Sequence, residues 1–184
     1  MKKLILLCVF LAGPGWAACP KVPDISSDMD VLIERARAAE NDSAGAAVSN
    51  EMWQLWLTAP DQAAQETLEK GMRARESYDF LSAIDAYEKL IAYCPDYAEG
   101  YNQRAFIYFL QGAFEAALVD LDKALDLSPR HVGAQSGRAL TLMNLGRISE
   151  ARIQLVSALE NNPWLSERFL MAEGGPLAPT VEDI

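Results

Sequence analysis

Three prolines, Pro95, Pro129 and Pro163, recur at a spacing of 34 residues, and the residues between them repeat as well. In the middle unit, Ala105 and Ala117 occupy places that are also small in the next unit. Small side chains at such places let two antiparallel helices approach closely. Proline cannot continue a helix, so each unit is expected to end at its proline. The period therefore predicts helical hairpins that stack on a shared core, which is an all-α fold.

The middle unit carries the fullest set of repeated positions. Its landmarks are Tyr101, Ala105, Tyr108, Gly112, Phe114, Ala117, Leu121, Ala124 and Pro129. This pattern resembles the tetratricopeptide repeat, a helix-turn-helix unit of 34 residues. The resemblance implies an α-solenoid with units at 64–97, 98–131 and 132–165, which together make up a little over half of the chain.

The turns inside the units are predicted from the residue at the end of each first helix. Gly112 and Gly146 stand where a left-handed backbone is often required. Tyr78 takes this place in the first unit. We therefore expect the first turn to differ in shape from the other two.

Two further segments flank the repeats and are expected to act as capping helices. Residues 19–63 contain an extended arm and two amphipathic patterns, at 28–40 and 44–58, which form a degenerate repeat or a cap on the open N-terminal end. Trp53 and Trp56 are expected to pack against the first clear repeat, with an aromatic pocket for a partner as the alternative. Residues 164–172 are predicted to form a C-terminal capping helix, and 173–184 a disordered tail.

The first 18 residues have the pattern of a secretory signal peptide. Lys2 and Lys3 precede a short apolar run that ends in small residues. We therefore expect a periplasmic or secreted protein. One alternative is an uncleaved membrane anchor. Another is a lipoprotein anchored through Cys19, although Trp16 stands where a lipoprotein usually has leucine.

Cleavage of this segment would leave two cysteines, Cys19 and Cys94. An even number in an oxidising compartment indicates a disulfide, which would stabilise the fold by about 4 kcal/mol in the chain-entropy model. Two unrelated thiols are the alternative. Two cysteines and one histidine, His131, do not make a metal-ligand cluster, so no metal or other cofactor is expected.

The family resemblance also implies a binding face. In such repeats the first helix of each unit lines the concave side, which is expected to bind a peptide or helix of a partner protein. The residues assigned to this face are Met72, Asn102, Gln103, Phe106, Phe109, Leu140, Met143 and Asn144. The alternative is that the chain's own termini cover it.

Other polar positions of the family are altered or structural. One subgroup holds a carboxylate with lysine, asparagine and arginine clamps, and those places here are Leu68, Met72, Gln103, Gly133 and Gly137. A chaperone-tail adaptor is therefore not expected. Arg104 and Asp120 are expected to form a structural ion pair between the helices of the second unit.

The formal net charge of −10 argues against binding to nucleic acid or to an anionic membrane surface. No catalytic motif or small-molecule substrate site is apparent, so an enzyme is not expected. The chain most resembles short exported tetratricopeptide proteins of Gram-negative bacteria. Its expected function is protein binding on the concave face. The alternatives are a self-associating scaffold that closes a homodimer, and a membrane-tethered accessory of envelope assembly or cytochrome maturation.

Overall fold

The computed structural model describes residues 18–179, and within that range every regular element is a helix. The signal-peptide prediction therefore lies almost wholly outside the described residues. The elements are α1 (Ser26–Ala38), α2 (Asp42–Trp56), α3 (Gln62–Glu76), α4 (Phe80–Tyr93), α5 (Ala98–Leu110), α6 (Phe114–Leu127), α7 (Val132–Asn144), α8 (Ile148–Asn161) and the 3-10 helix η1 (Ser166–Met171). The predicted all-α solenoid is confirmed.

Side-chain caps fix where several helices begin. The carboxylates of Asp61 and Asp79 accept the backbone N–H groups of Ala64 and Ser82, and Asn41 caps α2 in the same way. These bonds satisfy N–H groups that have no partner inside the helix. The starts of α2, α3 and α4 therefore follow from a short polar residue placed just before each of them.

The three hairpin turns have one shape, so the prediction of a different first turn is wrong. Tyr78 has φ +60°, close to the +74° of Gly112 and Gly146. The same backbone bond closes each turn, from Asp79 N to Ala74 O at 2.9 Å in the first hairpin. Tyrosine here accepts a left-handed backbone because the surrounding hairpin imposes it, at a cost that glycine avoids.

Replacing Tyr78 by glycine is expected to raise the free energy of unfolding by about 1 kcal/mol, because the left-handed strain disappears. The Tyr78 side chain is 81% exposed, so little packing is lost. Chemical denaturation measures the change. Gly112→Ala is the matched control and should destabilise the fold, since it introduces the same strain; a destabilised Tyr78→Gly variant would contradict this reading.

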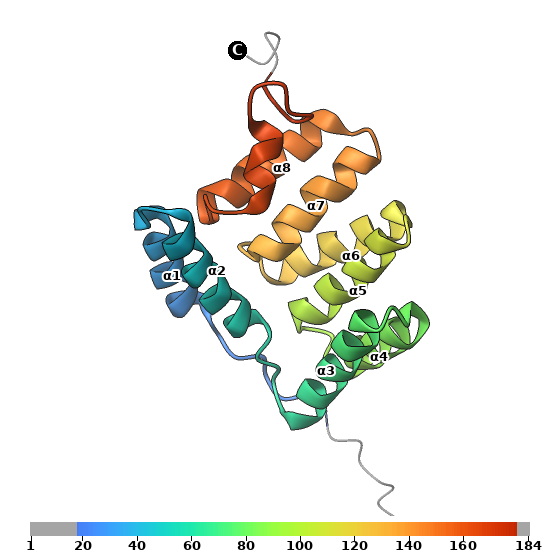
Figure 1. Cartoon of the computed structure of the whole chain (residues 1–184). Helices are drawn as coiled ribbons and strands as arrows, with labels where there is room; N and C mark the ends of the chain where they lie inside the picture. Colours follow the sequence, from blue (N-terminus) through green and yellow to red (C-terminus); the bar gives the residue numbers. More distant parts are fainter. Residues whose placement is uncertain (1–17, 180–184) are drawn as a thin grey trace, which may run out of the picture.

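Each hairpin pairs its helices through small residues. Ala83, Ala117 and Ala151 are fully buried, as their repeated positions predicted. Gly71 packs so closely on the ring of Tyr87 that an added Cβ would lie 2.3 Å from Cε1. Consecutive hairpins also pack against each other, α4 on α5 and α6 on α7, so α3–α8 form one column with a continuous core (Figure 1).

The N-terminal hairpin α1–α2 does not extend this column, contrary to the predicted cap or degenerate repeat. Figure 1 shows it beside the stacked helices rather than on their open end. Its core cluster takes in Val132 at the start of α7 and Leu165 after α8, which belong to the far end of the column. The hairpin therefore spans the side of the stack, reaching from the first repeat towards the last.

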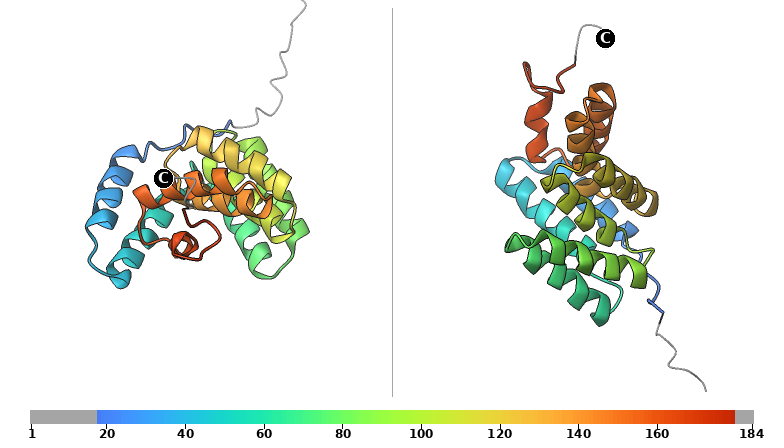
Figure 2. Two further views of the ribbon diagram at one scale, coloured as in Figure 1. Left: turned by 90° about the horizontal axis from the view of Figure 1, so that it is seen from above. Right: turned by 90° about the vertical axis from the view of Figure 1, so that its right-hand side faces the viewer.

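The C-terminal segment covers α8 and meets the N-terminal hairpin (Figure 2). The predicted capping helix is the short η1. Residues 173–179 are not the expected disordered tail: the Leu177 side chain is fully buried, and Arg152 donates hydrogen bonds to the carbonyl oxygens of Leu177 and Ala178. An apolar residue that fills the end of the last repeat explains why this segment is packed.

A disulfide joins Cys19 to Cys94, with Cα atoms 5.2 Å apart and 75 positions separating them in the sequence. Cys94 ends α4 and is buried in the core of the first repeat. The bond therefore attaches the arm that precedes α1 to the opposite end of the molecule from the C-terminal segment. Among the described residues, no helix is both long and apolar enough to span a membrane.

Candidate functional site

A groove runs between α2 and the inner faces of α3, α5 and α7. Its cavity volume is about 510 Å³, within the ordinary range of ligand pockets. Most of its lining is apolar and aromatic. The main contributors are Trp53 from α2, Met72 from α3, Phe106 and Phe109 from α5, and Leu140 from α7. Phe106 is 44% exposed, so an apolar surface remains open to an occupant.

Six of the eight residues assigned to the concave face line this groove, and two do not. Met72, Asn102, Gln103, Phe106, Phe109 and Leu140 lie along it. Met143 instead packs into the core of the last repeat, and the Asn144 amide donates to the Leu140 carbonyl oxygen at the outer end of α7. The groove is therefore shorter than the predicted strip and ends before Met143 in α7.

Gln103 was assigned to the partner-binding face, but its side-chain amide is already bonded within the protein. Its Nε2 donates to Glu99 Oε1 at 2.5 Å, and its Oε1 accepts from Arg75 Nη1 at 2.7 Å and from the Tyr87 hydroxyl at 3.4 Å. Both ends of the amide are therefore used inside the protein. Gln103 is a structural link between the first and second repeats.

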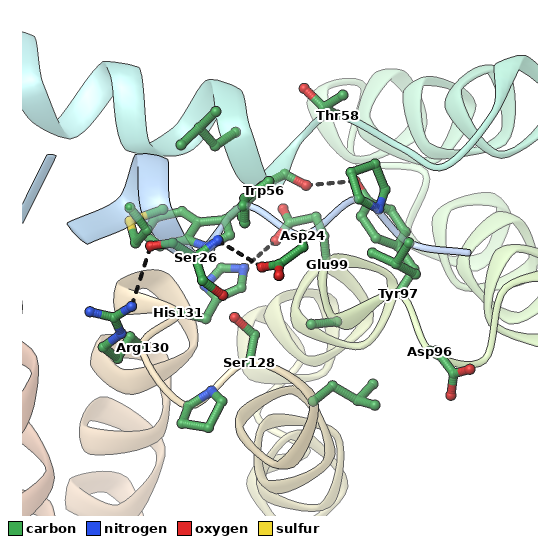
Figure 3. A pocket seen from close by; sticks show the side chains of 18 residues that line it. Asp24, Ser26, Trp56, Thr58, Asp96, Tyr97, Glu99, Ser128, Arg130 and His131 are labelled. Atoms are coloured by element: carbon green, nitrogen blue, oxygen red, sulfur yellow. Dashed lines mark hydrogen bonds and ion pairs between the residues drawn. The ribbon is translucent and has the colours of Figure 1, made fainter. Parts of the chain in front are cut away.

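Glu99 is the centre of a buried polar network. Its Oε2 lies 2.7 Å from His131 Nε2 and 3.0 Å from Asn102 Nδ2, and both Glu99 and His131 are almost wholly buried. Figure 3 shows Glu99 and His131 facing each other beneath Trp56. Burying a carboxylate is costly unless several donors surround it, and three donors do so here.

Trp56 links this network to the N-terminal hairpin. Its ring stacks on His131 with centroids 4.3 Å apart, and its carbonyl oxygen accepts from the Tyr97 hydroxyl at 2.6 Å. Burial raises the pKa of Tyr97 above its ordinary value, so this hydroxyl stays a donor. The C-terminal end of α2 is therefore fixed against Tyr97 and His131, the residues that precede α5 and α7.

Trp53 and Trp56 thus pack on the junction before α7, and not on the first clear repeat as predicted. Trp53 lies over Gly133, where an added Cβ would come within 2.5 Å of its ring. Gly133 marks one of the altered clamp positions in the sequence. A glycine at this position indicated that another part of the chain packs where a side chain would lie. The sequence alone did not identify that part as Trp53.

The N-terminal end of α2 is held by the C-terminal segment. Trp164 packs against Gly45 and donates its indole N–H to the Ala36 carbonyl oxygen at 2.8 Å. Asn162 Nδ2 donates to Ser49 Oγ at 2.7 Å, and Arg168 pairs with Asp42. With both ends anchored, α2 forms a fixed wall of the groove.

Arg104 and Asp120 form a bidentate ion pair, with both N–O distances at 2.7 Å. The hydrogen bonds that Arg104 donates to the Asp120 carboxylate raise the pKa of Arg104 above its ordinary value. The pair joins α5 to α6 away from the groove. Arg138 makes an equivalent bond to Gln154 in the next repeat, which places this contact among the features that set hairpin geometry.

A second, smaller cavity of about 210 Å³ lies under the N-terminal arm, beside Glu99 and His131. It contains polar groups, but in the described part of the chain no buried side-chain nitrogen or oxygen lacks a hydrogen-bond partner. The residues described here also contain no group of three or more His, Cys, Asp or Glu side chains suited to a metal ion. The apolar groove between α2 and the repeats is therefore the candidate site.

Comparison with known proteins agrees with this geometry. The family model of the tetratricopeptide repeat matches residues 98–131. The chain is 29% identical over 118 residues to a TPR repeat-containing protein of Rhizobium etli, covering 64% of this chain and 58% of that protein. It is 40% identical over 76 residues to the tetratricopeptide repeat protein 36 homolog of Nematostella vectensis, covering 41% of each. The chain thus spans about half the length of these curated relatives.

Solved structures show the same arrangement of hairpins. The first TPR of Spaghetti (RPAP3) bound to an HSP90 peptide superposes with a TM-score of 0.56 at 27% identity, covering 58% of this chain and 84% of that one. The TPR2B domain of yeast Sti1 in its complex with an Hsp70 peptide gives 0.54 at 27% identity, covering 58% and 88%. The predicted resemblance to the tetratricopeptide repeat is thus confirmed, with residues 98–131 matching the family model. The predicted resemblance to exported proteins of Gram-negative bacteria stays a prediction.

Proposed function

We propose that this chain is a non-catalytic interaction module that holds an apolar segment of a partner protein in the groove between α2 and the repeats. The observation that carries the proposal is an apolar groove of about 510 Å³ with Phe106 exposed in it. Preformed grooves of this kind bind peptides through apolar side chains, with a few polar groups that fix orientation. The similar TPR domains named above are bound to HSP90 and Hsp70 peptides, which supports a protein partner.

The partner is expected to differ in chemistry from those chaperone peptides. Leu68 is fully buried, and Gly133 is covered by Trp53, so two of the family's clamp positions carry no charge that could hold a terminal carboxylate. The chain's net charge of −10 instead favours a segment flanked by basic residues.

We further propose that the protein works in the periplasm or outside the cell. The leader pattern of residues 1–18 and the Cys19–Cys94 disulfide support this location, because disulfides persist in oxidising compartments. A Cys19 sulfur that is bonded to Cys94 cannot also carry a lipid thioether. The disulfide and the lipoprotein alternative therefore exclude each other.

The proposed function is tested by selecting short random peptides on the disulfide-bonded protein. We expect selected peptides to be rich in apolar residues and to bind the Phe106→Ser/Phe109→Ser variant at least about tenfold more weakly, because apolar anchors dominate such interfaces. Isothermal titration measures the affinities, and circular dichroism checks that the variant folds.

The matched control is Val119→Ser, which removes an exposed apolar side chain from α6 outside the groove. Peptides should bind this variant as they bind the unaltered protein. Selected peptides that bind equally well to the double phenylalanine variant would contradict the proposed site.

A further inference from the structure

We infer that Asn102 presents only a hydrogen-bond acceptor to the groove, so that the segment bound there must offer an N–H donor beside its apolar group. This inference rests on the proposed function and specifies the chemistry of the occupant. Asn102 is 6% exposed and lines the groove near Phe106, where an unpaired polar atom on either side would be costly.

The first step is the tautomer of His131. Its Nδ1 accepts the backbone N–H of Ala134 at 3.2 Å, as the cap of α7. A ring nitrogen that accepts an N–H carries no proton, so the proton of the neutral ring is on Nε2. His131 Nε2–H therefore donates to Glu99 Oε2, which must act as an acceptor.

The second step is the orientation of the Asn102 amide. A carboxylate only accepts hydrogen bonds, so the Asn102 atom that faces Glu99 Oε2 at 3.0 Å must be the NH₂ group. The amide oxygen, Oδ1, then points away from Glu99. The orientation of this asparagine is thus dictated by the charge of Glu99 and not chosen freely.

The third step is that Oδ1 is unused. No hydrogen bond to it occurs within residues 18–179, while every buried side-chain nitrogen or oxygen there has a partner. Oδ1 therefore keeps some contact with solvent, and the groove is the cavity that Asn102 lines. The side chains that line the groove are mainly apolar, and Arg75, which also lines it, is bonded to Gln103 Oε1. A donor from the occupant is what completes the site.

The test uses two compounds that differ in one N–H group, indole and 1-methylindole. Both are apolar and aromatic, and only indole can donate to Asn102. We titrate each into the ¹⁵N-labelled, disulfide-bonded protein and follow the side-chain signals of Trp53 and Asn102 by NMR. Indole is expected to bind about fivefold more tightly, which is the typical gain from one hydrogen bond in a desolvated site.

Variants locate the preference. Asn102→Ala should abolish it while both compounds still bind. Asn144→Ala, which changes an asparagine at the end of α7 outside the groove, should leave it unchanged. Glu99→Gln tests the positioning role. A glutamine side chain offers one acceptor oxygen to the three donors that meet at Glu99. Arg75 fixes the orientation of Gln103, and the backbone N–H of Ala134 fixes that of His131. The Asn102 amide is therefore the group that can reverse its orientation. The preference for indole should then fall.

The outcomes separate the two proposals. If neither compound shifts the Trp53 signal, the groove does not bind apolar groups and both proposals fail. If both bind with equal affinity, or if the preference survives in Asn102→Ala, the proposed function stands and the inference about Asn102 is wrong. An unchanged preference in a folded Glu99→Gln variant would remove Glu99 as the positioning residue. If that variant does not fold, the Asn102→Ala comparison still decides the central point.

Discussion

Replacing Cys19 by serine is expected to lower the free energy of unfolding by about 4 kcal/mol, because the disulfide closes a long loop and restricts the unfolded chain. The cysteines are 75 positions apart. Cys19 is the partner to change, since Cys94 is buried and its side chain then stays in the core of the first repeat. The loss measured is therefore that of the cross-link and not of a cavity.

Urea denaturation with and without reductant measures this effect. The unaltered protein should lose about the same stability on reduction, and the serine variant should not respond to reductant. If reduction leaves the midpoint of the unaltered protein unchanged, the disulfide does not constrain the chain as described. The arm before α1 should also become more accessible to proteases, because the bond attaches it to α4.

Replacing Trp164 by alanine is expected to lower the free energy of unfolding by about 3 kcal/mol, because a large aromatic contact with the N-terminal hairpin is lost. The change should also release the N-terminal end of α2. Trp164 packs on Gly45 and donates to the Ala36 carbonyl oxygen. Hydrogen exchange should quicken in α1 and α2 and remain slow in α3–α6. The wall of the groove would then be mobile, and peptide binding should weaken.

Gly45→Ala gives an independent check on the same contact. Alanine normally stabilises a helix interior relative to glycine by about 1 kcal/mol, but here its Cβ would lie 2.1 Å from Trp164 Cγ. We expect this variant to be less stable and to show the same exchange pattern as Trp164→Ala. Phe169→Ala is the control, since Phe169 is exposed and should have little effect. A stabilised Gly45→Ala variant would show that Trp164 does not hold α2.

The repeats themselves could be predicted from the sequence because each repeated position is determined by interactions between residues that are near one another in the chain. The 34-residue period, the small residues at the helix contacts and the prolines fix the units, and the ion pair of Arg104 with Asp120 joins helices that are adjacent in the chain. The turn at Tyr78 shows the limit of this reasoning. A residue that disfavours a conformation can still adopt it when the neighbouring helices impose the geometry.

The groove could be predicted only in part, because half of it depends on contacts between distant segments. The inner-face residues follow from their place in the repeat, but the wall formed by α2 depends on Trp56 meeting His131 and on Trp164 meeting Gly45. No local pattern encodes such pairings. The internal hydrogen bonds of Gln103 could likewise not be predicted, because one of them comes from Arg75 in another repeat.

The most direct test of the central claim is photocrosslinking in the cells that produce the protein. A photoreactive phenylalanine analogue is placed at position 106, in the groove, and separately at position 119, on the outer surface of α6. We expect position 106 to crosslink to one partner through an apolar segment, identified by mass spectrometry, and position 119 not to do so. Crosslinking to the same partner from both positions, or from position 119 alone, would contradict the claim that the groove between α2 and the repeats is the binding site.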